Sequence, residues 1–139
     1  MSQALLAGIS RTTRPQSMLR RFLALDAVVT GGNGLAYLFA SDALGELLGV
    51  DAALLFELGL FLTVYAAGVG FLASRPQPPV LGVKAVVDCN LLWVLASLVS
   101  LVAWLEPTTA GLLWIPMQAG TVAAFAALQW AALRGATTA

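Results

Sequence analysis

Four ionisable residues interrupt otherwise apolar stretches of this sequence and are the first candidates for chemistry: Asp26, Glu57, Lys84 and Asp88. An ionisable side chain costs roughly 2.5–3.5 kcal/mol at the centre of a membrane helix on insertion scales, so it usually has a partner or a function. Amide side chains occur in the same stretches, at Asn33, Asn90, Gln118 and Gln129. These residues predict polar sites within apolar surroundings.

The sequence lacks the residues that several common kinds of site require. It has no histidine and one cysteine, Cys89. A histidine general base, a Ser-His-Asp triad, a histidine-ligated metal or haem and an internal disulfide are therefore excluded. There is also no phosphate-binding glycine loop and no nucleic-acid-binding motif. We expect no metal, no cofactor and no nucleic-acid partner, and we expect Cys89 to pack as a small buried apolar residue.

The composition predicts a membrane protein, because 60% of the residues are hydrophobic, 10% are charged and the mean hydropathy is +0.89. Membrane helices need roughly 20 apolar residues. Four stretches reach this length, at about 22–40, 53–73, 83–105 and 112–133. We expect a single all-α domain over residues 1–139, a bundle of four transmembrane helices preceded by a basic segment at 1–20.

Charge is distributed unequally between the two ends of the predicted spans. All seven basic residues fall on the side of the termini and the 74–79 loop, including Arg11, Arg14, Arg20 and Arg21. The positive-inside rule assigns that side to the cytoplasm. We therefore expect a multi-pass protein of the inner (plasma) membrane with both termini in the cytoplasm.

Depth along the spans divides the polar residues into two tiers. At about 1.5 Å per residue, the tier nearer the cytoplasm contains Asp26, Lys84, Asp88, Asn90 and Gln129. Lys84 and Asp88 are four residues apart and share a helix face. One interpretation is a structural ion pair in which Lys84 neutralises Asp26 and Asp88. The other is a direct role for the two acids in handling protons or substrate.

The outer tier contains Asn33, Tyr37, Glu57 and Gln118. No basic residue lies at this depth, so burial would favour the neutral acid form of Glu57 and leave a proton donor in place. Glu57 is therefore the candidate general acid, with Asn33, Tyr37 and Gln118 as ligand-binding residues. Hydration of Glu57 at the membrane interface is the alternative.

The stretch TGGNG at 30–34 lies at the depth of the outer tier, as do Pro116 and Gly120. Helix interruptions at membrane depth are tolerated where the backbone is buried in protein or lines a polar cavity. Two interpretations remain open. The glycines form a face that a neighbouring helix approaches closely, or they form a distorted stretch that opens a binding site.

Three further stretches carry a family resemblance: LDAVVTGGNGLAYL at 25–38, RPQPP at 75–79 and NLLWVLAS at 90–97. With them the chain resembles a loose group of small bacterial integral membrane proteins with four predicted spans, over most of residues 20–134. The resemblance implies a compact four-span bundle and no catalytic residue. In that group apolar residues are usual where this chain has Glu57, Lys84 and Asp88.

Three functions remain open as alternatives. The first is a pocket for a small lipophilic molecule, with acid-catalysed isomerisation or cyclisation of an isoprenoid-like substrate by Glu57. Trp93 and Trp114 would bind this ligand and stabilise developing cations. The second is proton-coupled transport or an ion pathway through Asp26, Asp88 and Glu57. The third is a structural or accessory subunit of a membrane complex. The expected partners are membrane lipids, a lipophilic ligand and a second copy of the chain in a homo-oligomer.

Overall fold

The computed structural model describes the backbone of residues 3–138 and the side chains of residues 16–137. This part of the chain forms five α-helices and no strand, namely α1 (Gln3–Phe39), α2 (Ser41–Leu48), α3 (Ala52–Ser74), α4 (Val80–Ala103) and α5 (Thr109–Thr138). Four of them are long and apolar enough to cross a membrane, over Gln16–Phe39, Ala52–Ser74, Val80–Ala103 and Thr109–Thr137. The prediction of an all-α chain with four such helices is confirmed. The side chains of Arg11 and Arg14 lie outside the described residues.

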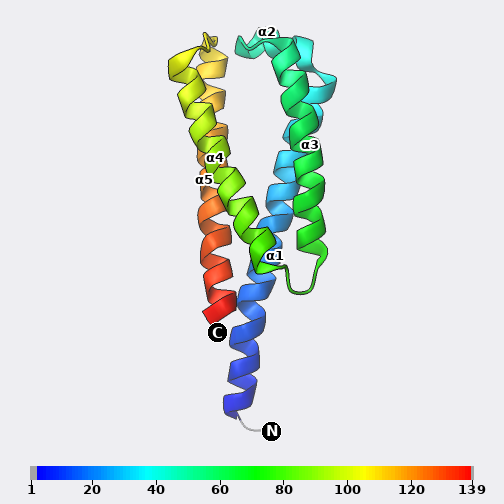
Figure 1. Ribbon diagram of the computed structural model, residues 1–139, viewed down its shortest axis with the longest axis vertical. Coiled ribbons are helices and arrows are strands. Elements are labelled where there is room, and N and C mark those ends of the chain that lie inside the picture. Colours follow the sequence, from blue (N-terminus) through cyan, green and yellow to red (C-terminus); the bar gives the residue numbers. More distant parts are fainter. Residues whose placement is uncertain (1–2, 139) are drawn as a thin grey trace.

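The four long helices are arranged as two antiparallel pairs. α1 packs along α3, and α4 packs along α5 (Figure 1). The pairs meet mainly through α1 and α5, whereas α3 and α4 are consecutive in the sequence but have little backbone contact. Figure 1 shows the pairs close together toward the end that carries the C terminus and farther apart toward the opposite end.

Glycines allow α1 and α3 to approach each other closely. A Cβ atom added to Gly34 would lie 2.9 Å from the Cβ atom of Leu62, and one added to Gly59 would lie 2.6 Å from the backbone nitrogen of Leu38. Such small residues are typical of helix contacts in membranes. α1 continues through the TGGNG stretch and α5 continues through Pro116. The close-packing interpretation is therefore confirmed at Gly34, and the helix is not interrupted there.

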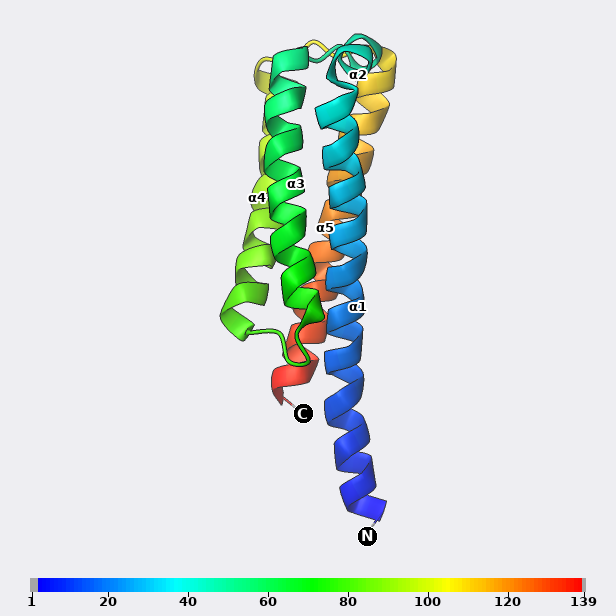
Figure 2. The same cartoon turned by 90° about the vertical axis from the view of Figure 1, so that its right-hand side faces the viewer.

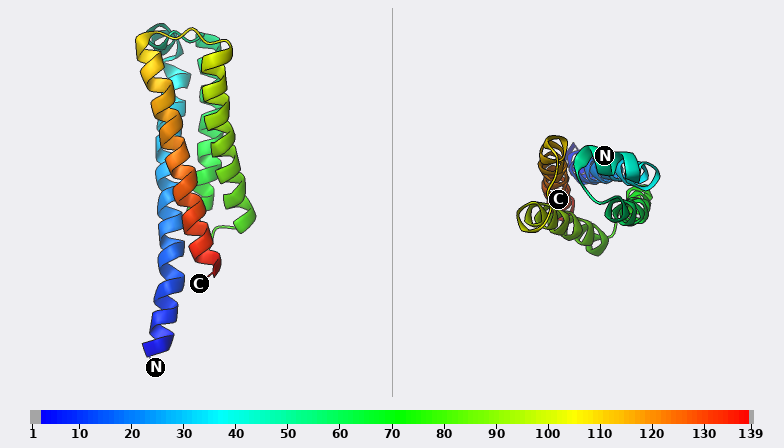
Figure 3. Two further views of the ribbon diagram at one scale, coloured as in Figure 1. Left: turned by 90° about the vertical axis from the view of Figure 1, so that its left-hand side faces the viewer. Right: turned by 90° about the horizontal axis from the view of Figure 1, so that it is seen from above.

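Helix α2 and the loop between α4 and α5 close one end of the bundle, which we call the capped end (Figure 2 and Figure 3). Thr108 donates its backbone N–H to the carbonyl oxygen of Leu48 at 3.1 Å and its hydroxyl to that of Leu47 at 2.5 Å. Gly49 ends α2 in the left-handed conformation with φ of 72°, where glycine is favoured. The opposite end, with the 75–79 loop and the C terminus, is the terminal end.

The largest buried apolar cluster lies toward the terminal end and includes residues from all four long helices. Its members are each at most 5% exposed: Leu19, Leu23, Val69, Val83, Val86 and Leu133. Toward the capped end, a second and smaller cluster has its buried members, Tyr37, Leu55 and Leu62, on α1 and α3, with Trp93 of α4 packed against them. The apolar core therefore joins the two helix pairs at the terminal end and leaves room between them toward the capped end.

Candidate functional site

A buried hydrogen-bond network joins the four long helices next to the apolar core. One carboxyl oxygen of Asp26, Oδ2, accepts hydrogen bonds from Asn90 Nδ2 at 2.9 Å and from Gln129 Nε2 at 2.7 Å. The other, Oδ1, accepts one from the Thr30 hydroxyl at 2.8 Å. The hydroxyl of Tyr65 donates to Asn90 Oδ1 at 3.0 Å. Each of the four long helices thus contributes to the network.

The network satisfies polar groups that water does not reach. Asp26 and Gln129 are 0% exposed, and Asn90 is 3% exposed. An unpaired polar group costs more in such a place than the net gain from an ordinary hydrogen bond, so a complete network holds its members in one arrangement. All three donors to Asp26 are neutral. The network therefore fixes how the α1/α3 pair sits against the α4/α5 pair.

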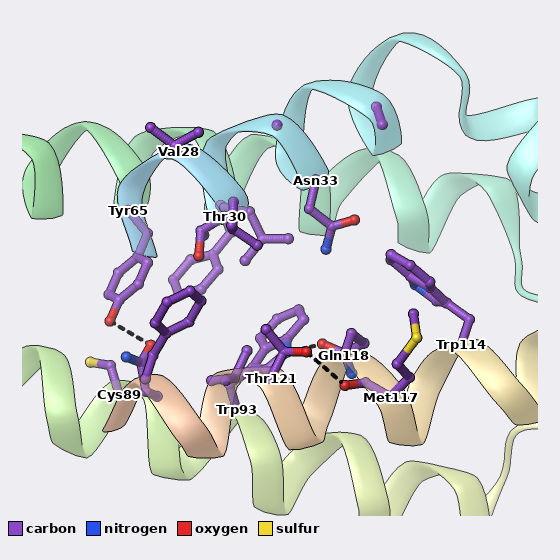
Figure 4. Close-up of a pocket in the computed structure, with 18 residues that line it drawn as sticks. Val28, Thr30, Asn33, Tyr65, Cys89, Trp93, Trp114, Met117, Gln118 and Thr121 are labelled. Carbon is purple, nitrogen blue, oxygen red and sulfur yellow. Dashed lines mark hydrogen bonds between the residues drawn. The ribbon is translucent and has the colours of Figure 1, made fainter. Parts of the chain in front are cut away.

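A cavity of about 420 Å³ lies between the helix pairs on the capped side of this network (Figure 4). This volume is within the range of small-molecule sites, which are mostly apolar with a few placed polar groups. Aromatic side chains from α3, α4 and α5 line it, namely Phe61, Tyr65, Trp93, Trp114 and Phe125. Thr30, Tyr65 and Asn90 belong both to the network and to the lining. The network thus forms one wall of the cavity.

Asn33 projects from α1 into the cavity, toward the side on which Gln118 and Trp114 lie (Figure 4). Within residues 16–137 its amide makes no hydrogen bond. Gln118 differs, because its Oε1 accepts from Trp93 Nε1 at 2.7 Å and its Nε2 donates to the carbonyl oxygen of Ile115 at 2.9 Å. Asn33 is therefore an amide of the lining that, among the described residues, is free both to donate and to accept.

A second cavity of about 180 Å³ continues toward the capped end. Trp93, Trp114 and Gln118 line both cavities, so the two indole rings lie at the boundary between them. The indole N–H of Trp114 donates to the hydroxyl of Tyr37 at 2.7 Å. The ring of Trp93 stacks on that of Phe61 with centroids 6.5 Å apart. Together the two cavities form an elongated space divided by hydrogen-bonded aromatic side chains.

The structure brings most of the predicted ligand-binding residues together. Asn33, Trp93, Trp114 and Gln118 line the larger cavity, and Tyr37 lines the smaller one. In the other tier, Asp26, Asn90 and Gln129 meet in the network.

Glu57 does not join this site. It is exposed and lines a surface hollow near the capped end with Asp51 and Glu106. The buried face of α3 carries Leu55 and Gly59, and Glu57 lies two residues from each, or about 200° around the helix. The candidate general acid therefore points away from the cavity, and its hydration at a membrane interface stays a prediction.

The predicted ion pair of Asp26, Lys84 and Asp88 is not formed. Lys84 and Asp88 are exposed on α4 and make no ion pair within the described part of the chain. The face of α4 that meets Asp26 carries Asn90 instead. Cys89 also differs from expectation, since it is exposed and lines the larger cavity instead of being buried in a core.

The network contains two residues that sequence reasoning missed, Thr30 and Tyr65. Thr30 follows Asp26 by four residues, so it lies on the same helix face, and this spacing is a signal that could have identified it. Tyr65 reaches Asn90 from α3 across to α4, a contact between helices that no spacing in the sequence indicates.

Comparison of the chain with protein-family models, with curated proteins and with solved structures found no match. What the site can do is therefore inferred from the residues that line the cavity. Among the described residues, the side chains lining the larger cavity include several aromatic rings and amides but no acidic or basic group. This arrangement can hold a small apolar molecule by contact and orient one hydrogen-bonding group on it.

Proposed function

We propose that this protein binds a small lipophilic molecule with one polar group in the cavity between its helix pairs. The observation that carries the proposal is the amide of Asn33, which projects into an aromatic cavity of about 420 Å³ without a hydrogen-bond partner among the described residues. Asn33 is half-buried, and an amide that faces an aromatic cavity with both its N–H and its oxygen free is suited to pair with a polar group on a ligand.

In this proposal the four long helices cross the inner (plasma) membrane, with both termini in the cytoplasm. The basic side chains at the terminal end support this orientation, including Arg20, whose Nε donates to the carbonyl oxygen of Ala73 at 3.1 Å. Acidic residues occur toward the capped end, at Asp42, Glu46, Asp51 and Glu106. By the positive-inside rule the capped end then faces away from the cytoplasm.

The ligand enters the cavity from the side of the bundle. The lining includes Val28 on α1, which is 72% exposed, and Met117 on α5, which is 56% exposed. Phe61 on α3, which is 53% exposed, lines it as well, so the larger cavity extends to the lateral surface of the bundle, which lipid covers in a membrane. At the capped end, by contrast, α2 and Thr108 lie between the helix pairs and solvent.

The proposed activity is binding and not acid-catalysed rearrangement of the ligand. The candidate general acid, Glu57, lies outside the cavity, and the described lining contains no carboxyl group. Asp26 lies within the network, where hydrogen bonds from Thr30, Asn90 and Gln129 hold its carboxyl group. The transport and accessory-subunit alternatives stay predictions.

A pair of glycines offers a matched test of whether the cavity is occupied. Gly32 lines the larger cavity and a Cβ atom added there meets nothing within 4 Å. Gly120 on α5 has equally open surroundings but lines none of the described cavities. We expect a lipophilic molecule to copurify with the wild type and with Gly120→Leu, and to be lost from Gly32→Leu, in native mass spectrometry from mild detergent. Equal retention by the two variants would contradict the proposal.

The role of Asn33 is tested with farnesol and with farnesene, its hydrocarbon counterpart without a hydroxyl. Among the four tryptophans, Trp93 and Trp114 line the cavity, so Trp104→Phe and Trp130→Phe leave fluorescence that reports on it. We expect saturable farnesol binding that weakens roughly 5- to 10-fold in Asn33→Leu, the effect of about one hydrogen bond. Farnesene binding should change little in the same variant. An equal loss of affinity for both probes would show that Asn33 does not hydrogen-bond to the hydroxyl group of farnesol.

A further inference from the structure

The exposed face of α4 carries a heptad pattern. Side chains spaced alternately by three and four residues are all exposed: Leu81, Lys84, Asp88, Leu91, Leu95, Leu98 and Val102. We call this set the α4 stripe. Its spacing is that of the a and d positions through which two helices pack along a shared seam. Over its most apolar 18 residues, α4 also buries the smallest share inside the chain, 17% against 28% for each of the other three spans.

The two charges within the α4 stripe are what indicate a protein partner. An apolar stripe alone is suited to contact with lipid, but Lys84 and Asp88 occupy consecutive positions of this one. Asp88 lies about 12 Å along the helix from its first residue, Val80. Neither residue has an ion-pair partner within residues 16–137. Ionisable residues at such depth almost always pair, since lipid tails do not solvate them.

We propose that the α4 stripe is the interface of a parallel homodimer in which α4 packs against α4 of a second copy. Both copies enter the membrane in the same orientation, so the two-fold axis runs along the membrane normal. In a two-fold interface each contact occurs twice with the partners exchanged. Lys84 of each copy therefore pairs with Asp88 of the other, and the stripe is complementary in charge to itself.

The apolar part of the α4 stripe supplies the packing. Leu91, Leu95, Leu98 and Val102 continue the seam toward the capped end, where each contacts its counterpart or the adjacent layer. The cavity takes its α4 residues from the other side of the helix, at Asn90 and Trp93, and from the flanking Cys89. The dimer therefore leaves the proposed binding site in place and is independent of it.

Single-cysteine cross-linking tests the interface in native membranes. Cys89→Ser removes the only cysteine of the chain, and Leu95→Cys places a new one in the middle of the α4 stripe. Val64 on α3 is a matched control, because it is 73% exposed and lies outside the stripe. We expect Leu95→Cys to give an oxidised product of twice the chain mass with at least tenfold the yield of Val64→Cys. Equal yields, or linkage of Leu95→Cys to a different protein alone, would overturn the proposal.

A charge exchange tests the ion pairs. Lys84→Asp and Asp88→Lys each set like charges against one another across the seam, and we expect each to lower the Leu95→Cys cross-linking yield about fivefold or more. The double variant Lys84→Asp/Asp88→Lys restores opposite charges and should recover most of the yield. Circular dichroism shows which variants are folded. The reference for the yield is Leu95→Cys with Lys84 and Asp88 unchanged. Single variants that cross-link as well as the parent would contradict the proposed pairing.

Discussion

The contact between the two helix pairs differs between the terminal half and the capped half of the bundle. In the terminal half, Asp26 of one pair bonds to Asn90 and Gln129 of the other, next to an apolar core shared by all four helices. In the capped half, Gln118 bonds to Trp93 and to Ile115, both within its own pair. The two glutamines of α5 thus differ: Gln129 bonds across the pairs where the bundle is closed, and Gln118 bonds within its own pair beside the cavity, where the hydrogen bond from Trp114 to Tyr37 joins the pairs instead.

The largest loss of stability in the terminal half is expected when the carboxyl group of Asp26 is removed. Asp26→Leu leaves the donors of Thr30, Asn90 and Gln129 without their acceptor in a buried place. We expect the free energy of unfolding to fall by about 3 kcal/mol or more, measured by denaturation in mixed micelles. Asp26→Asn keeps the size and one acceptor oxygen and should lose less. A loss below about 1 kcal/mol for Asp26→Leu would contradict the assigned role of the network.

Two glutamines on α5 give a matched comparison of the halves. Gln129→Leu removes a donor to Asp26 and the acceptor that Asn90 Nδ2 reaches at 3.0 Å. Gln118→Leu removes the acceptor of the Trp93 indole, which borders a cavity that water or a ligand can enter. We expect losses of unfolding free energy of about 2 kcal/mol and at most about 1 kcal/mol respectively, in the same denaturation assay. A larger loss of unfolding free energy for Gln118→Leu than for Gln129→Leu would contradict the difference between the terminal and capped halves.

Two tyrosines extend the comparison to single hydroxyl groups. The hydroxyl of Tyr65 donates to Asn90 and lies 3.1 Å from the carbonyl oxygen of Val86. Tyr65→Phe should lower the unfolding free energy by about 1 kcal/mol. The hydroxyl of Tyr37 accepts from Trp114 in the capped half. We expect Tyr37→Phe to cost about half as much, and thermal unfolding of both variants measures the difference.

The smallest effect on stability is expected at Asn33. Its amide has no hydrogen-bond partner among the described residues, so Asn33→Leu breaks no such bond. The unfolding free energy should stay within about 0.5 kcal/mol of the wild type, while the affinity for farnesol falls. A loss of more than about 1 kcal/mol would mean that the amide has a structural partner, and Asn33 would then belong with the network.

The sequence was sufficient to predict the four long helices, because apolar length alone identifies them. It did not identify α2, since Ser41–Leu48 is short and lies in a polar separator. Depth along each span also correctly grouped Asp26 with Asn90 and Gln129, and Asn33 with Gln118. Helix rise gives this height directly from residue number.

The face of the helix on which each residue lies could not be predicted in the same way. In water, the polar face of an amphipathic helix identifies the side that is not buried. In these helices both the buried face and the outer face are apolar, so depth alone could not show that Glu57, Lys84 and Asp88 lie on exposed faces. The contact of Tyr65 with Asn90 requires that α3 and α4 each turn the right face toward the other helix.

The closed capped end has a consequence for how the cavity would fill. With α2 and Thr108 covering that end and the exposed Val28 and Met117 lining the larger cavity, a ligand bound as proposed would arrive from the surrounding bilayer. Its occupancy then follows its mole fraction among the lipids, by mass action, and not its concentration in water. A molecule that partitions strongly into the membrane could saturate a site of modest intrinsic affinity while being scarcely present in the aqueous phase.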